Sequence, residues 1–376
     1  MRILIINSVC GIGSTGNICV DIANSFVMQG HEVKIAYGRK KVPTEYKSIS
    51  YRIGNVIDNY ISCCKARIFD NDGFNNRIAT KHFIKWADDF NPDMIWLHNL
   101  HGYYINVELL FDWIKSRPFM EVKWTLHDCW AFTGHCAHFT LAKCNKWKTQ
   151  CCDCVQKRVY PKSIMADNSK ENFLNKKRLF TGVSKMRIIT PSNWLCKLVK
   201  QSFLGSYETD VLHNTINGEV FKPRNSSFRQ KLGLLNKRIV LGVASNWSES
   251  KGLNDFVELS KMLNDDYAIV LVGLTKKQAK KIPNKIITVE NNQTATKLSE
   301  IYSAADVFVN LTLEDNYPTV NLEAQACGTP VITYRTGGSA ESVPKENVCE
   351  VGDLEQVVQM INRIVADKGR NLQSQE

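Results

Sequence analysis

The sequence of 376 residues has no uninterrupted apolar run close to the roughly 18 residues that a membrane-spanning helix needs. Its start, MRILIINSVCGIG, lacks the basic residues, long apolar stretch and small-residue cleavage site of a signal peptide. Repeats, low-complexity segments and helix-turn-helix, RRM or KH patterns are also missing. We therefore expect a cytoplasmic protein that begins with a buried strand and has no nucleic-acid partner.

The composition is that of a soluble globular protein, with 44% apolar and 23% charged residues. A single core seldom grows beyond about 250–300 residues, so two domains are expected. The net charge of +11 lies in the first part, because residues 1–223 hold 30 Lys and Arg against 19 Asp and Glu, and the rest holds 18 of each. A basic half can meet an anionic membrane, a phosphorylated substrate or nucleic acid, or it can be a solvated surface.

Short apolar runs alternate with amphipathic segments in both halves of the chain. Strands are predicted at 2–9, 93–99 and 121–128 in the first half, and at 238–246 at the start of the second. This alternation predicts two parallel sheets covered by helices, each of the Rossmann-like α/β type. The stretch VFKPRNSS is typical of a linker, so we place the domains at 1–220 and 221–376.

A glycine-rich loop follows the first strand. Gly11, Gly13 and Gly16 form GxGxxG before a predicted helix, where backbone N–H groups can approach a phosphate. The same pattern also occurs in tight turns without a ligand. The second strand ends near Arg39 instead of an acid, which suits NADP, so an NADP-dependent oxidoreductase is an alternative.

Histidines follow two of the predicted strands in the first half. His127 and Asp128 follow EVKWTL at the end of the run at 121–128, and His98 and His101 lie at the end of the preceding one. The carboxyl ends of parallel strands face the ligand crevice, so His127 can contact a reacting group and Asp128 can orient it. A structural role for a single histidine is the competing interpretation.

The second half carries a lysine and two spaced acids. Lys251 and Gly252 open a predicted helix, where a cation beside free N–H groups suits a diphosphate. Asp315, with Glu314 as a neighbouring alternative, and Glu323 flank the start of another helix, where carboxylates can accept hydrogen bonds from sugar and ribose hydroxyls. An exposed lysine and acids that merely favour a helix start would look the same.

Taken in order, these motifs resemble a retaining glycosyltransferase of family 4, with the GT-B fold, over nearly the whole chain. The most specific stretch is DNYPTVNLEAQACGTPVI followed by TGGSAE. TLHDCWAFTGHCAHF and the later Tyr160-Pro161 resemble the branch that builds bacterial surface polysaccharides. The resemblance implies two Rossmann-like domains facing an interdomain cleft, with the acceptor side in the first and the nucleotide-sugar site in the second.

The resemblance also implies roles for individual residues. The catalytic group would be His127, beside the donor sugar, and Asp315, in contact with it. Lys251 would bind the donor diphosphate and Glu323 the ribose. The remaining donor-binding positions would be Gly11, Gly13, Gly16, Asn246, Gly252, Thr319 and Val320.

Three departures from the family pattern stand out. The first acid is usually Glu, and Asp315 is shorter. Asn246 replaces an Arg that often shares the diphosphate, and the polar ending ADKGRNLQSQE stands where many members have a helix returning to the first domain. The family implies a front-face attack by the acceptor, stabilisation of the leaving diphosphate by Lys251, and no catalytic metal.

Six of the 13 cysteines fall between Cys129 and Cys154, and the odd total argues against a disulfide framework. Cys136, Cys144, Cys151 and Cys154 have a spacing that predicts a structural zinc site, although His135, His138 or Cys152 can substitute and free thiols or a redox pair remain alternatives. The same loop, 129–161, holds Lys143, Lys146, Lys148, Trp130 and Trp147. Cations among aromatic residues favour a membrane interface.

The sequence thus predicts a hexosyltransferase-type, retaining enzyme. Its donor would be a UDP-sugar, with a GDP-sugar as second choice, and its acceptor a lipid-linked saccharide of a capsule or exopolysaccharide. Contact with the anionic inner face of the cell membrane would be peripheral. Besides the oxidoreductase, a non-catalytic, zinc-bearing scaffold that binds sugar or lipid is an alternative.

Overall fold

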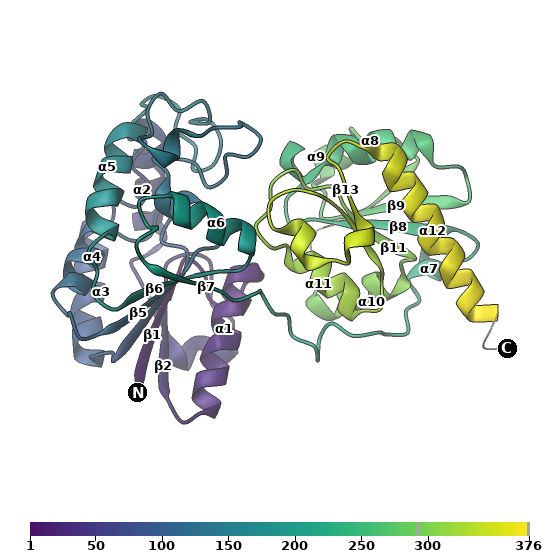
Figure 1. Cartoon of the computed structure of the whole chain (residues 1–376). Helices are drawn as coiled ribbons and strands as arrows, with labels where there is room; N and C mark the ends of the chain where they lie inside the picture. The colour runs from purple at the N-terminus through teal and green to yellow at the C-terminus, as the bar shows by residue number, and fades with distance from the viewer. Residues whose placement is uncertain (291–292, 374–376) are drawn as a thin grey trace. The chain divides into compact units, whose positions relative to one another are not determined.

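The computed structural model of the protein describes residues 1–290 and 293–373. The chain forms two compact units, Met1–His213 and Asn214–Glu376. Each unit contains one sheet in which all neighbouring strands are parallel (Figure 1). This confirms the predicted α/β architecture of two Rossmann-like units. No helix in the described ranges is long and apolar enough to cross a bilayer.

The first unit is built on a seven-stranded sheet with the order β3-β2-β1-β4-β5-β6-β7. Its strands are β1 (Arg2–Asn7), β2 (Glu32–Tyr37), β3 (Ser50–Arg52), β4 (Met94–Leu97), β5 (Glu121–Thr125), β6 (Met186–Thr190) and β7 (Glu208–Val211). Its helices are α1 (Gly13–Met28), α2 (Val56–Phe69), α3 (Arg77–Phe90), α4 (Val107–Lys115), α5 (Ser169–Phe180) and α6 (Asn193–Gln201), with short 3-10 turns at Thr44–Ile49, Trp130–Phe132 and Lys146–Lys148.

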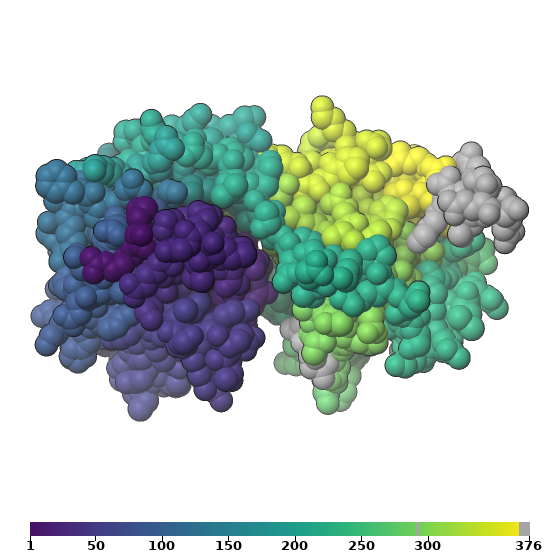
Figure 2. Space-filling view, turned by 90° about the horizontal axis from the view of Figure 1, so that it is seen from below, coloured from purple at the N-terminus to yellow at the C-terminus, as the bar shows by residue number. Residues whose placement is uncertain are grey.

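Side chains that alternate along β1 fill two different cores. Ile3 and Ile5 belong to a cluster with Val20 of α1, whereas Leu4 and Ile6 belong to a larger cluster with Phe111 of α4. A strand that buries both faces needs the near-continuous apolar run that the sequence has there. In Figure 2, the dark purple segment that includes α1 lies at the surface of this unit.

The second unit is built on a six-stranded sheet with the order β10-β9-β8-β11-β12-β13. Its strands are β8 (Arg238–Val243), β9 (Tyr267–Val272), β10 (Ile286–Val289), β11 (Val307–Asn310), β12 (Val331–Tyr334) and β13 (Val348–Cys349). Its helices are α7 (Phe228–Lys231), α8 (Leu253–Met262), α9 (Lys276–Ala279), α10 (Ala295–Ala304), α11 (Thr319–Ala326) and α12 (Leu354–Gln373), with 3-10 turns at Glu249–Lys251, Ser339–Ser342 and Lys345–Asn347.

Two clusters cover the two faces of this second sheet. Val240 and Val309 pack with Phe256 of α8 and Ile361 of α12 on one face. The other face packs against α7, α10 and α11, as the cluster around Tyr302 shows. The helix α12 continues through most of the polar ending of the chain, and residues 374–376 of that ending lie outside the described residues.

Candidate functional site

Each sheet has a switch point at which the chain changes the direction in which it adds strands. In the first sheet this point lies between β1 and β4, and in the second between β8 and β11. Loops that leave the carboxyl ends of such strand pairs diverge, and the crevice between them is where parallel α/β sheets bind ligands. The predicted residues follow these strands: Gly11 follows β1, His98 follows β4, Lys251 follows β8 and Asp315 follows β11.

The glycine-rich loop of the first unit has the geometry of an anion cradle. Gly11 and Gly13 have positive φ angles of 64° and 68°, and α1 begins at Gly13 after Ile12, which provides no side-chain cap. A Cβ atom on Gly13 would meet nothing within 4 Å, so the space beside it is open. The uncapped N–H groups at the start of α1 can therefore donate to an anion.

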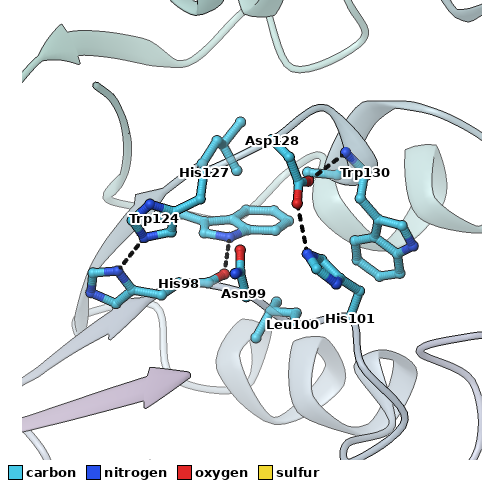
Figure 3. A pocket seen from close by; sticks show the side chains of 10 residues that line it. His98, Asn99, Leu100, His101, Trp124, His127, Asp128 and Trp130 are labelled. Atoms are coloured by element: carbon cyan, nitrogen blue, oxygen red, sulfur yellow. Dashed lines mark hydrogen bonds and ion pairs between the residues drawn. The ribbon is translucent and has the colours of Figure 1, made fainter. Parts of the chain in front are cut away.

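A pair of stacked histidines lies after β4 and β5, in the pocket that Figure 3 shows. His98 Nδ1 is 2.9 Å from His127 Nε2, and the two rings are 17° from parallel with centroids 5.2 Å apart. Burial lowers the pKa of His127 to about 4, and burial together with His127 lowers that of His98 well below its usual value. Both imidazoles are therefore neutral near pH 7, and a single hydrogen atom lies between them.

The burial of His98 favours one position for that hydrogen atom. His98 is 1% exposed, and its Nε2 atom has no hydrogen-bond partner among the residues that the structure describes. A buried N–H group without a partner is rarer than a buried acceptor without one. We therefore assign the hydrogen to His98 Nδ1, which donates to His127 Nε2. His127 then carries its own hydrogen on Nδ1 and can donate it to a ligand.

A second chain of hydrogen bonds runs beside this pair (Figure 3). His101 Nε2 is 2.8 Å from Asp128 Oδ2, and His101 Nδ1 is 2.9 Å from the Tyr160 hydroxyl. Asp128 Oδ1 also accepts a hydrogen bond from the Trp130 backbone N–H. Asp128 therefore orients His101, whereas the sequence predicted that it would orient its neighbour His127.

The charges of this second chain are set by the same contacts. Burial acts to lower the pKa of His101, but the charge of Asp128 and its hydrogen bond raise it above the usual value. Burial acts to raise the pKa of Asp128, but His101 brings it down to about 2. The first unit thus places a neutral histidine pair next to a histidine–carboxylate pair that favours charge.

A buried lysine contacts Trp130, which lines this pocket, and the sequence did not indicate it. Lys176 of α5 donates hydrogen bonds to the carbonyls of Trp130 and Thr133 at 2.9 and 3.1 Å, and its Nζ lies 3.5 Å from the centroid of the Trp130 ring. Burial lowers its pKa to about 7. Nothing in the sequence distinguishes Lys176 from the neighbouring Lys177, because only the packing of α5 selects which of them is buried.

Lys251 and Asp315 meet in the second unit. Lys251 Nζ is 2.6 Å from Asp315 Oδ2, and it is 3.4 Å from both Thr312 Oγ1 and the Glu314 carbonyl oxygen. The two side chains are 34% and 21% exposed. Because the pair is open to solvent, the lysine can exchange its partner for a bound anion.

Two glycines allow these loops to approach each other. Gly252 has a φ of 70°, and a Cβ there would lie 2.1 Å from the Leu311 carbonyl oxygen. Gly337 has a φ of 51°, and a Cβ there would lie 1.8 Å from the Asp315 carbonyl oxygen. Only glycine fits both positions. The TGGSAE stretch thus acts by holding the backbone of Asp315, since Gly338 N also donates to that carbonyl at 3.2 Å.

Glu323 lies on α11, which begins at Thr319 after Pro318 as predicted. Burial raises the pKa of Glu323 to about 6, although hydrogen bonds from Tyr302 and Thr319 lower it. Thr319 and Val320 form the first turn of α11, where Pro318 gives no side-chain cap. Asn246 is exposed in the loop that follows β8.

The cysteine-rich loop does not form the predicted zinc site. Among residues 1–290 and 293–373, no group of three or more His, Cys, Asp and Glu side chains is placed so that it can hold a metal ion. Cys136 is instead hydrogen-bonded to Cys154, and Cys151 Sγ accepts the Gly134 backbone N–H at 3.2 Å. None of the 13 cysteines, all of which lie within the described ranges, forms a disulfide bond. The predicted ligands do lie near one another, since Cys151 also interacts with Cys144 and Cys154, but they form no metal-binding group among the described residues.

The aromatic residues of this loop are also not at the surface. Trp130 and Trp147 are 2% and 1% exposed and belong to the main core, where Trp147 stacks on Phe139. Burying these large rings removes apolar area from water, which stabilises the loop. The expectation that Trp130 and Trp147 contribute to a membrane interface was therefore wrong, although Lys143, Lys146 and Lys148 are exposed.

Comparisons with known proteins point to one class. Residues 224–375 match the family described as Glycosyl transferases group 1. A protein of Escherichia coli strain K12, described as "Putative colanic acid biosynthesis glycosyl transferase WcaC", is 24% identical over 96% of this chain and 89% of its own length.

Solved structures share the fold across both units. Sucrose-phosphate synthase (tll1590) from Thermosynechococcus elongatus has a TM-score of 0.70 and 16% identity, covering 97% of this chain and 90% of its own. Anabaena Alr3699/HepE in complex with UDP has a TM-score of 0.66 and 15% identity, covering 98% and 91%. The chain thus has the GT-B fold, and its residues 224–375 are similar to group 1 glycosyl transferases.

Proposed function

We propose that the protein is a retaining glycosyltransferase of family 4. It transfers a hexose from a UDP-sugar to a lipid-linked saccharide during synthesis of a bacterial surface polysaccharide, at the inner face of the cell membrane. The observation that carries the proposal is the Lys251–Asp315 pair at the switch point of the unit that matches group 1 glycosyltransferases. The relative from Escherichia coli supports the polysaccharide, and the UDP complex of Alr3699/HepE supports the nucleotide.

The donor diphosphate binds beside Lys251 in this proposal. A diphosphate carries more negative charge than a carboxylate, so it competes with Asp315 for the Lys251 ammonium group. The uncapped first turn of α11, at Thr319 and Val320, adds N–H donors. Once released from the lysine, the Asp315 carboxylate can turn toward the donor sugar and accept hydrogen bonds from it. This freedom compensates for a side chain that is shorter than the usual Glu.

Glu323 holds the ribose in this proposal. Its carboxylate already accepts a hydrogen bond from Tyr302 at 3.0 Å, which fixes the carboxylate plane. An ionised carboxylate has further lone pairs for hydroxyl donors. Binding of both ribose hydroxyls favours the ionised form, and thereby opposes the raised pKa that burial produces.

The reaction separates charge between the leaving diphosphate and the donor sugar. Lys251 acts on the diphosphate, and His127 acts on the sugar. Negative charge grows on the leaving diphosphate, where the Lys251 ammonium group stabilises it. His127, with its hydrogen on Nδ1, donates to a hydroxyl of the donor sugar. The acceptor hydroxyl attacks the anomeric carbon from the side of the leaving phosphate while the bond from that carbon to the phosphate oxygen breaks. The acceptor's proton passes to the departing diphosphate, and attack on the same face retains the configuration.

A donor panel tests the proposal directly. The purified chain is titrated with UDP, GDP and NADP, and is then incubated with UDP-sugars and a lipid-linked acceptor while UDP release and the anomeric configuration of the product are measured. We expect UDP binding and an α-configured product from an α-linked donor. Binding of NADP alone would reject the proposal in favour of the oxidoreductase. UDP binding without turnover on any donor would favour the scaffold.

A further inference from the structure

The helix α2 (Val56–Phe69) turns small side chains toward the core and large apolar ones toward solvent, the reverse of the usual amphipathic helix. Its buried residues are the small Ser62 and Ala66. Its large apolar side chains are exposed, from 40% for Ile68 to 71% for Tyr60. Helices of soluble proteins normally turn their apolar side to the core. A partner that covers the outward apolar side of α2 would remove this unfavourable contact with water.

Five of these exposed side chains lie on one side of the helix. We call the set Val56, Ile57, Tyr60, Ile61 and Ile68 the α2 stripe. Its members recur at helical spacing, and at about 100° per residue they cover less than half of the helix circumference. Lys65 lies beyond one edge of the stripe and Arg67 lies within it, close to the other edge, both exposed. The one acid of the helix, Asp58, is held in the capping box with Asn55.

A second segment extends the stripe at the end of α2. Ile164 N donates to the Arg67 carbonyl at 2.7 Å, and Ala166 N donates to the Ile68 carbonyl at 3.0 Å. Ile164 and Met165 are themselves 55% and 68% exposed. The preceding residues include the exposed cations Arg158 and Lys162. Apolar side chains flanked by cations thus come from two parts of the chain that these hydrogen bonds hold together.

This surface is connected to the histidine pocket. The segment that carries Ile164 also carries Tyr160, which is 40% exposed and bonded through its hydroxyl to His101 at 2.9 Å. A molecule held at this surface by an apolar tail would therefore have its polar end near the pocket of Figure 3.

We propose that the α2 stripe, with Ile164 and Met165, docks onto an anionic lipid bilayer. Apolar side chains with basic flanks insert at the boundary between headgroups and acyl chains, and the cations meet anionic headgroups. The excess positive charge of the first part of the chain acts in the same direction. A symmetric pair of chains would bring two sets of cations together, which costs free energy, so a bilayer fits better than a second copy.

The docking surface itself does not depend on the proposed function. Only the following account of the acceptor rests on it. If the acceptor is lipid-linked, its lipid lies in the bilayer under the α2 stripe and its saccharide reaches toward Tyr160 and the histidine pocket. Membrane contact in this proposal is thus made by the α2 stripe with Ile164 and Met165, and not by the buried Trp130 and Trp147.

Vesicle co-sedimentation of the full chain tests the docking surface. The vesicles are phosphatidylcholine alone and phosphatidylcholine mixed with phosphatidylglycerol. The apolar variant is Ile57→Ser with Ile61→Ser, and its control is Met28→Ser, an exposed apolar residue at the end of α1. The charge variant is Lys65→Gln with Arg67→Gln, and its control is Lys197→Gln with Lys200→Gln on α6, which removes the same charge.

We expect the wild-type chain to bind the mixed vesicles and to bind pure phosphatidylcholine more weakly. The apolar variant should lose about tenfold or more in affinity for the mixed vesicles, and both controls should keep theirs. The charge variant should lose its preference for the anionic lipid. Equal binding by all variants, or the absence of vesicle binding, would overturn the proposal.

Two further measurements separate this proposal from its rivals. Sedimentation velocity without lipid reports a dimer, and a dimer that dissociates in the apolar variant would assign the α2 stripe to a second copy and overturn membrane docking. Titration with UDP shows whether each variant is still folded and binds donor. Vesicle binding without any UDP binding would leave the docking surface standing and would reject the proposed glycosyltransferase activity.

Discussion

The first and second units use the same position in the sheet for opposite kinds of chemistry. In the first unit, β4 at the switch point and its neighbour β5 lead to uncharged imidazoles, with His98 and His127 2.9 Å apart. In the second unit, the strands at the switch point lead to a charged pair, with Lys251 and Asp315 2.6 Å apart. A Rossmann-like sheet therefore determines where a ligand binds, and the loop residues determine which chemical groups each unit can recognise.

The degree of burial separates the two groups in the same way. His98 is almost completely buried, and burial keeps both imidazoles of the pair neutral. Lys251 and Asp315 are partly exposed and remain able to change partners. A buried neutral donor suits a sugar hydroxyl, whereas an accessible cation suits a diphosphate that arrives from solvent.

The largest effect is expected from removal of the cation in the second unit. Lys251→Ala should lower the transfer rate by about 10²–10³-fold, because the leaving diphosphate loses its stabilising charge. UDP affinity, measured by calorimetric titration, should fall at least tenfold or so. The control is Lys261→Ala on α8, where the exposed lysine pairs with Glu258. Unchanged UDP affinity in Lys251→Ala would contradict the assignment.

Removal of the central histidine of the first unit should affect transfer without affecting nucleotide binding. His127→Ala is expected to slow transfer by about 10²-fold, because a donor to the sugar is lost. UDP affinity should stay at the wild-type value. His82→Ala, an exposed histidine on α3, is the control. A loss of UDP affinity in His127→Ala would show that the division of tasks between the units is wrong.

A smaller effect is expected from His98, which acts only through His127. His98→Phe keeps an aromatic ring but removes the hydrogen bond to His127 Nε2, and should lower kcat about tenfold with little change in KM. His98→Gln restores a side-chain donor and should recover part of the rate. Nitrogen-15 NMR of His127 reports its tautomer directly. An unchanged tautomer in His98→Phe would refute the positioning role.

The smallest effect is expected from the pH dependence of Glu323. Burial raises its pKa to about 6, so the ionised form that accepts ribose hydroxyls increases as the pH rises from about 5 to about 7. UDP affinity of the wild type should increase a few-fold over this range relative to that of Glu323→Gln. The comparison with Glu323→Gln removes the titration of UDP itself. Parallel pH profiles for the two proteins would exclude this role.

The strands and their positions along the chain were predictable because buried parallel strands need continuous apolar runs. The runs at 2–9 and 238–246 became β1 and β8, and Pro318 marked the start of α11. The pairing of Lys251 with Asp315 needed the tertiary structure, since 63 residues lie between them in the sequence. The outward orientation of α2 also escaped sequence reading, because periodicity shows that a helix has an apolar side but not which way that side faces.

The sequence by itself determined the two α/β units and the glycine, histidine, lysine and acid motifs, because local apolar patterns and turn chemistry encode strands, helices and the loops between them. Only the tertiary structure decided which side chains meet. It joined Asp128 to His101 instead of His127, buried Lys176 under Trp130, kept the cysteines from forming a metal site among the described residues, and left the apolar stripe of α2 facing solvent. These outcomes depend on how distant segments pack, and that information is not contained in the spacing of residues along the chain.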